Sequence, residues 1–122
     1  MYDHIGLKVK DLDVAVRFYE AALSALGHVV GSREGSYAGI GPKDEPGLWL
    51  YRAQGATGPG VHVAFRAKDR AAVDLFHRSG LAAGGKDNGE PGLRADYSPT
   101  YYAAFLIDPD GNNVEAVCMA AK

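Results

Sequence analysis

The chain has 122 residues, of which 47% are hydrophobic and 23% charged, a composition typical of a folded globular domain. The net charge is −2 and the Lys and Arg residues are scattered, which leaves no electrostatic footprint for nucleic acid. The apolar stretches are too short to span a bilayer, and Asp3 and Lys8 stand where a secretory signal needs apolar residues. The single cysteine fits a reducing compartment. We therefore expect one cytoplasmic domain over residues 1–122 that binds neither nucleic acid nor membrane.

An internal repeat divides this domain. The segment His4-Ile-Gly-Leu-Lys-Val-Lys-Asp11 aligns without a gap with His62-Val-Ala-Phe-Arg-Ala-Lys-Asp69, 58 positions later. Identical residues continue along both copies: Phe18 and Phe76, Leu23 and Leu81, Ala25 and Ala83, Gly27 and Gly85. The Gly-rich segment Gln54–Gly60 between them is typical of a linker. The repeat predicts a first module over residues 1–55 and a second over 60–122.

In chain order, the first copy predicts a strand over 3–10, a helix from Asp11 or Asp13 to about 26, and short strands near 28–33, 36–41 and 47–53. The second copy predicts a strand over 60–67, a helix over 69–83, and strands near 100–107 and 112–119. Asp108-Pro-Asp-Gly111 predicts a turn that joins the last two strands as a hairpin. Residues 84–100 are rich in Gly and Pro, and we expect a mobile loop around one weak strand that closes over the site as a lid. The fold class is therefore α+β, with two βαβββ modules that form a curled mixed sheet, a cup, and helices on its outer face.

Strand alternation predicts which side chains face this cup. Ile5, Leu7 and Val9 form an apolar face expected under the helix, so His4 lies on the opposite face, and His62 lies likewise in the second copy. In the last strand Val114, Ala116 and Cys118 form the apolar face, and Glu115 points into the cup. An unpaired buried carboxylate is costly, so Glu115 needs a cation or hydrogen-bond donors. We predict that His4, His62 and Glu115 converge on one divalent ion: Fe, Mn, Ni, Co or Zn.

Structural roles for these residues remain open. Hydrogen-bonded core histidines are common. For Glu115, the alternative to metal binding is a salt bridge to Lys8 or Arg66. His28 and His77 are expected at the surface, and Cys118 is expected to be a buried, inert thiol.

The quoted motifs resemble one protein family. The opening His4-Ile-Gly-Leu-Lys-Val9, the second opening His62-Val-Ala-Phe65 and the ending Asp108-Pro-Asp-Gly-Asn-Asn-Val-Glu115 resemble the vicinal oxygen chelate superfamily of glyoxalases, bleomycin-resistance proteins and extradiol dioxygenases. The resemblance implies a cup around a divalent ion, with His4, His62 and Glu115 on ligand positions and a small-molecule substrate bound through neighbouring oxygens. Extradiol enzymes use an additional His as acid-base catalyst, and because His28 and His77 are poorly placed for that, we expect a tyrosine near the last strands (Tyr97, Tyr101 or Tyr102) to substitute. The expected catalytic residues are Glu115, Tyr101 and Tyr97. A homodimer is expected, since two modules leave edge strands and relatives of this size commonly dimerise, some with each cup built from two chains.

Aromatic residues expected to wall the substrate pocket are Trp49, Tyr51, Phe105 and Tyr101, and Arg94 and Tyr97 are expected to touch substrate from the lid. Two family features are missing. Trp49 or Leu50 stands where glyoxalase I enzymes take a fourth ligand, and Gly6 replaces the Thr of fosfomycin thiol transferases. Lyase, isomerase and dioxygenase chemistry therefore all stay open for a glyoxalase-like, metal-dependent enzyme. The alternative is a non-catalytic, drug-binding sequestration protein like the bleomycin-resistance proteins.

Overall fold

The computed structural model describes residues 1–53 and 60–121, so most of the expected linker lies outside the described residues. Module 1 contains β1 (Ile5–Val9), α1 (Leu12–Ser24), β2 (Val29–Arg33), β3 (Tyr37–Gly41) and β4 (Leu48–Arg52). Module 2 contains β5 (His62–Arg66), α2 (Arg70–Ala82), β6 (Lys86–Leu93), β7 (Tyr102–Ile107) and β8 (Asn113–Cys118). The predicted α+β fold of two βαβββ modules is confirmed. Each helix has 13 residues, and no helix in the described ranges is long and apolar enough to cross a membrane.

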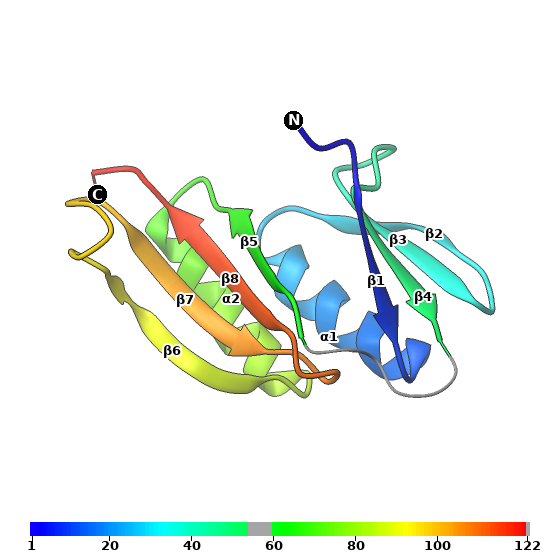
Figure 1. Cartoon of the computed structure of the whole chain (residues 1–122). Coiled ribbons are helices and arrows are strands. Elements are labelled where there is room, and N and C mark those ends of the chain that lie inside the picture. The colour runs from blue at the N-terminus through cyan, green and yellow to red at the C-terminus, as the bar shows by residue number, and fades with distance from the viewer. Residues whose placement is uncertain (54–59, 122) are drawn as a thin grey trace.

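Each module forms its own four-stranded sheet, in the order β1-β4-β3-β2 and β5-β8-β7-β6. The first strand of each module pairs in parallel with the last, and the remaining neighbours are antiparallel. No backbone ladder joins β1 to β5 within the described residues, so the two sheets are separate rather than one continuous curled sheet. The sheets stand side by side, and β1 and β5 run in opposite directions (Figure 1).

Both helices begin at an aspartate, as the sequence predicts. The Asp11 side chain accepts the Val14 backbone N–H, and the Asp69 side chain accepts that of Ala72, which satisfies donors that the first helical turn leaves free. Beyond these caps, Ala15, Phe18 and Ala22 recur at helical spacing and are fully buried.

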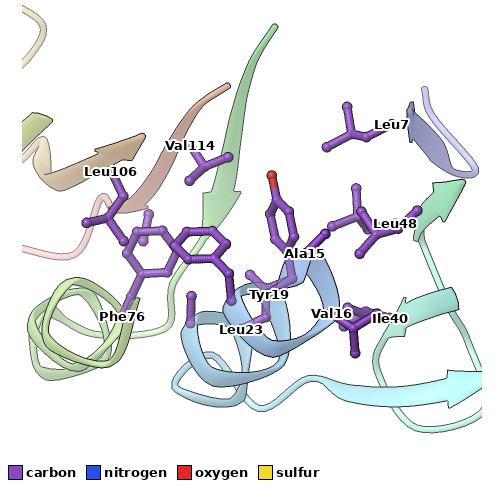
Figure 2. Packing of buried hydrophobic residues seen from close by; sticks show 14 of the residues in the cluster. Leu7, Ala15, Val16, Tyr19, Leu23, Ile40, Leu48, Phe76, Leu106 and Val114 are labelled. Atoms are coloured by element: carbon purple, nitrogen blue, oxygen red, sulfur yellow. The ribbon is translucent and has the colours of Figure 1, made fainter. Parts of the chain in front are cut away.

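One apolar core joins the two modules. Helix α1 lies between Ile40 and Leu48 of module 1 and Phe76, Leu106 and Val114 of module 2 (Figure 2). The close packing around α2 depends on small residues: a Cβ added at Gly80 would lie 2.3 Å from Leu106 Cδ1 of β7 and 3.3 Å from Phe18 Cε1 of α1, and one at Gly85, just after α2, would lie 2.5 Å from Phe18 Cε1. Because α1 packs against both modules, the core fixes their relative placement.

The predicted strand faces are largely correct. Leu7, Val9, Val114, Ala116 and Cys118 are all buried beneath the helices, and Cys118 is a free thiol, as expected. Ile5 is the exception, because 37% of it is exposed beyond the end of the helix-covered face.

The one strand expected within residues 84–100 is present, and it covers 8 residues of that segment. Residues Lys86–Leu93 form β6, which pairs with β7 through a ladder interrupted by two register shifts. The strand is tied to α2 by His77, which is buried rather than at the surface: its Nε2 lies 2.9 Å from Asp87 Oδ1. The Gly89 backbone N–H, together with His77, lowers the pKa of Asp87.

Candidate metal centre

Two of the three predicted ligands meet on the sheet of module 2. The Nε2 atom of His62, from β5, lies 3.1 Å from Oε1 of Glu115, from β8. The His62 Nδ1–H donates to the Asn113 backbone oxygen at 3.0 Å, because a carbonyl only accepts. Nε2 therefore faces the carboxylate, and a proton or a cation must lie between these two acceptor atoms. Donor atoms at this separation suit a single divalent ion, since each ligand atom lies about 2.0–2.2 Å from such an ion.

Glu115 is 2% exposed, which makes it the most deeply buried carboxylate of the site. Its second oxygen, Oε2, accepts a hydrogen bond from the Tyr101 hydroxyl. Burial together with this carboxylate raises the pKa of Tyr101 to about 12, so the hydroxyl keeps its proton at neutral pH and donates it to Glu115. The carboxylate is thus oriented with one oxygen toward tyrosine and the other toward histidine.

Aromatic and cationic side chains border this pair. Phe105 lies directly across the ladder from Glu115, and its ring stacks near-parallel to His62 at a centroid separation of 6.3 Å. The Arg94 guanidinium lies 5.4 Å from the centroid of the same ring. Tyr97 packs edge-on against Tyr101 at 5.0 Å and is 65% exposed. We call His62, Glu115, Tyr101 and Phe105 the module-2 half-site.

The remaining predicted residues lie on module 1. His4 Nδ1 is 2.7 Å from Asp3 Oδ1, which leaves its Nε2 available as a ligand. An open pocket of about 560 Å³ is lined by this pair together with Tyr37, Pro46, Trp49 and Tyr51. The Trp49 ring lies over Gly39, where an added Cβ would come within 2.7 Å of it, and a Cβ at Gly6 would lie 3.1 Å from Tyr51. We call Asp3, His4, Trp49 and Tyr51 the module-1 half-site.

One chain does not bring the two half-sites together. His4 precedes β1 and His62 begins β5, and these two strands run in opposite directions in separate sheets (Figure 1). Among the described residues, no three His, Cys, Asp or Glu side chains form a group that could hold an ion. The expected convergence of all three ligands is therefore wrong for a single chain.

The strand registers identify which residue of module 1 occupies the position equivalent to Glu115 of module 2. Glu115 pairs with Ala64 between β8 and β5, and the equivalent position of Ala64 in the first copy is Gly6. Gly6 pairs with Trp49, so Trp49 is the module-1 counterpart of Glu115. The protein therefore offers one histidine from module 1 and a histidine with a carboxylate from module 2.

Comparison with known proteins agrees with this architecture. The family model described as the Glyoxalase/Bleomycin resistance protein/Dioxygenase superfamily matches residues 2–116. The chain belongs to this superfamily. A glyoxalase/bleomycin resistance protein from Albidiferax ferrireducens T118 is 30% identical, with a TM-score of 0.85 over 97% of this chain and 98% of that one.

More distant structures show the same fold. A putative glyoxalase from Bacillus halodurans is 21% identical (TM-score 0.72, 97% and 95% covered), and a glyoxalase/bleomycin resistance protein/dioxygenase family enzyme from Burkholderia phytofirmans PsJN is 16% identical (TM-score 0.75, 97% and 98% covered). Among curated proteins, nothing matched significantly. The superfamily commonly binds a metal ion, and the histidine and carboxylate donors of this chain suit one.

Sequence patterns missed one feature that positions β8. Asp108 is buried, and its carboxylate accepts the backbone N–H groups of Asp110 and Asn112, the Asn112 side-chain amide and the Tyr19 hydroxyl. These bonds fix the predicted turn against α1, directly before the strand that carries Glu115. The turn motif indicated the reversal of the chain, but the Tyr19 contact is 89 positions away and no local pattern predicts it.

Proposed function

We propose that the protein is a glyoxalase-like, divalent-metal-dependent enzyme whose ion is held by His4, His62 and Glu115. In this proposal each site is assembled from module 1 of one copy and module 2 of another, which makes the protein a homodimer. The observation that carries the proposal is the short distance between the buried Glu115 carboxylate and His62. Glu115 Oε1 lies 3.1 Å from His62 Nε2, a separation that suits two ligands of one ion. The separation of His4 from this pair within one chain supports completion of the site by a second copy.

The bound ion would act as a Lewis acid toward a small substrate that offers two neighbouring oxygens. The chain's own residues prepare the site for such a ligand. Tyr101 holds a proton beside Glu115 and is positioned to pass it to, or hydrogen-bond with, an oxygen of the substrate. Tyr97, packed against Tyr101, supplies a second hydroxyl nearby.

Aromatic walls complete the proposed pocket from both copies. Phe105 contributes from module 2, and Trp49 and Tyr51 contribute from the module-1 pocket of the other copy. Flat apolar walls around a few polar anchors favour a planar organic substrate and exclude water from the reacting oxygens.

Metal titration of the purified protein tests this proposal. Calorimetry with Mn²⁺, Co²⁺, Ni²⁺ and Zn²⁺ should give one ion per chain for the wild type, and Glu115→Gln should weaken the affinity at least about 100-fold. Glu20→Gln, an exposed glutamate on α1, is the matched control and should bind normally. Equal affinities in all three proteins would overturn the proposal, and binding of aromatic ligands without metal would favour a sequestration protein.

A further inference from the structure

We propose that Arg94 is a carboxylate-binding residue and that the substrate carries an anionic group in addition to its chelating oxygens. The inference rests on the proposed function for where the chelating end of the substrate lies. It concerns the outer end of the module-2 half-site, where β6 borders β7.

The Arg94 guanidinium is held by the backbone rather than by another side chain. Its Nη1 donates to the Gly92 carbonyl at 2.9 Å, and its Nη2 donates to the Glu90 carbonyl at 2.7 Å. The face of the group lies on Phe105, 5.4 Å from the ring centroid. Because a guanidinium has five N–H donors, several remain for a ligand, and the group pays little conformational entropy when one binds.

Two glycines of β6 make room for this arrangement. A Cβ at Gly89 would lie 3.2 Å from Arg94 Nη2 and 2.9 Å from Phe105 Cδ1, and a Cβ at Gly92 would lie 3.2 Å from Arg94 Nη1. A side chain at either position would crowd the guanidinium, and one at Gly89 would also crowd the Phe105 ring. Gly89 and Gly92 therefore leave the space that the Arg94 side chain occupies over β6.

The charge of Arg94 is not neutralised by the protein. Its side chain is half-buried, and it takes no part in the salt bridges found in the described ranges. Its two hydrogen-bond acceptors are neutral carbonyls and its third neighbour is an aromatic face. A fixed, partly desolvated cation with free donors is the arrangement that binds a carboxylate or another oxyanion.

The position of Arg94 relative to the metal ligands sets the shape of the substrate. Ala64, Glu115, Phe105 and Gly89 lie in register across the four strands of the sheet. Neighbouring strands are about 4.8 Å apart, so Gly89, beneath Arg94, lies two strands or about 10 Å from Glu115. A small aromatic acid with two adjacent oxygens at its far end fits between them, with its ring over Phe105.

Paired ligands that differ only in charge test the inference. We would measure by calorimetry the affinity of metal-loaded protein for 3,4-dihydroxybenzoate and for neutral 3,4-dihydroxybenzamide, which share the adjacent oxygens. The wild type should prefer the acid by about tenfold, since charge-assisted hydrogen bonds are the stronger ones. Arg94→Gln should abolish the preference, Arg94→Lys should retain part of it, and Arg78→Gln, an exposed arginine on α2, should retain all of it.

The outcomes separate this inference from the proposed function. A preference that survives in Arg94→Gln, or no preference in the wild type, overturns the role of Arg94 while metal binding stands. An Arg94-dependent preference in a protein that binds no metal overturns the metal site and leaves the anion site in place. Failure of both probes to bind the wild type overturns the inference.

Discussion

At the scale of single residues, the two repeat histidines are anchored in the same way. His62 directs Nδ1 to the Asn113 carbonyl, and His4 directs Nδ1 to the Asp3 carboxylate. Each contact fixes the ring through Nδ1 and directs Nε2 away from that partner, which is how metal-ligating histidines are commonly oriented by a neighbouring acceptor. The repeat has therefore preserved the presentation of an imidazole nitrogen as well as the residue type.

The Tyr101–Glu115 hydrogen bond makes stability depend on pH at the alkaline end. The pKa of Tyr101 is raised from 10.0 to about 12 in the folded protein, so its contribution is fully present below pH 10 and is lost as pH rises through 12. The free energy of unfolding, measured in urea from pH 8 to 12, should fall more steeply in the metal-free wild type than in Tyr101→Phe. Tyr2→Phe, which changes an exposed tyrosine, should keep the wild-type slope. Identical slopes in all three proteins would mean that the hydroxyl does not donate to Glu115.

At the scale of the elements, the close packing of α2 on β7 and on α1 depends on Gly80. A Cβ there would approach Leu106 Cδ1 to 2.3 Å and Phe18 Cε1 to 3.3 Å, inside a fully packed core. Gly80→Ala should therefore destabilise the protein by about 1–3 kcal/mol despite the better helix propensity of alanine. Gly35→Ala, whose Cβ would meet nothing within 4 Å, should change stability by less than about 0.5 kcal/mol. Chemical denaturation of both variants checks this, and equal stabilities would show that the helices can separate without cost.

The elements also show where sequence patterns succeed and where they stop. Strand alternation and aspartate caps are local, so the order of β1 to β5, both helices and the burial of Val114, Ala116 and Cys118 could be predicted. β6 was expected only as one weak strand inside a loop, without bounds, because its Gly and Pro residues have low strand propensity and its pairing comes from β7 across register shifts. His77 was misplaced for a similar reason, since its partner Asp87 belongs to that strand, whose position was not predicted.

For the candidate site, strand parity correctly predicted the faces of Glu115 and His62, while their metal-binding roles stay a prediction. Parity on each strand correctly assigned Glu115 to the face opposite Val114 and Ala116, and it assigned His62 to the same side of the sheet. The relative placement of the two modules is set by the packing of α1 against its own sheet and against α2, which no single strand pattern encodes. For that reason the sequence left open whether His4 meets the other two predicted ligands within one chain or between two, and within one chain the three do not form a group.

At the scale of the whole molecule, the proposed metal ligands are divided between two modules that share one core. Helix α1 packs into the core shared by the two modules (Figure 2), and within one chain the three proposed ligands form no group that could hold an ion, among the residues that the structure describes. In the proposed site, module 1 supplies His4 and aromatic walls. Module 2 supplies His62, the Glu115 carboxylate and Arg94, whose guanidinium is held by backbone carbonyls. A two-fold symmetric dimer in which module 1 faces the partner's module 2 would create two identical, complete sites.

Complementation between two damaged chains tests this account most directly. His4→Ala and Glu115→Ala chains, each carrying a different histidine-free peptide tag, would be co-expressed and the mixed dimer purified through both tags. Each parent homodimer has a lesion in both sites and should bind no ion, whereas the mixed dimer has one intact site and should bind one ion per dimer with wild-type affinity. A mixed dimer that binds no more metal than its parents, or a chain that stays monomeric at micromolar concentration, would contradict a site built from two copies.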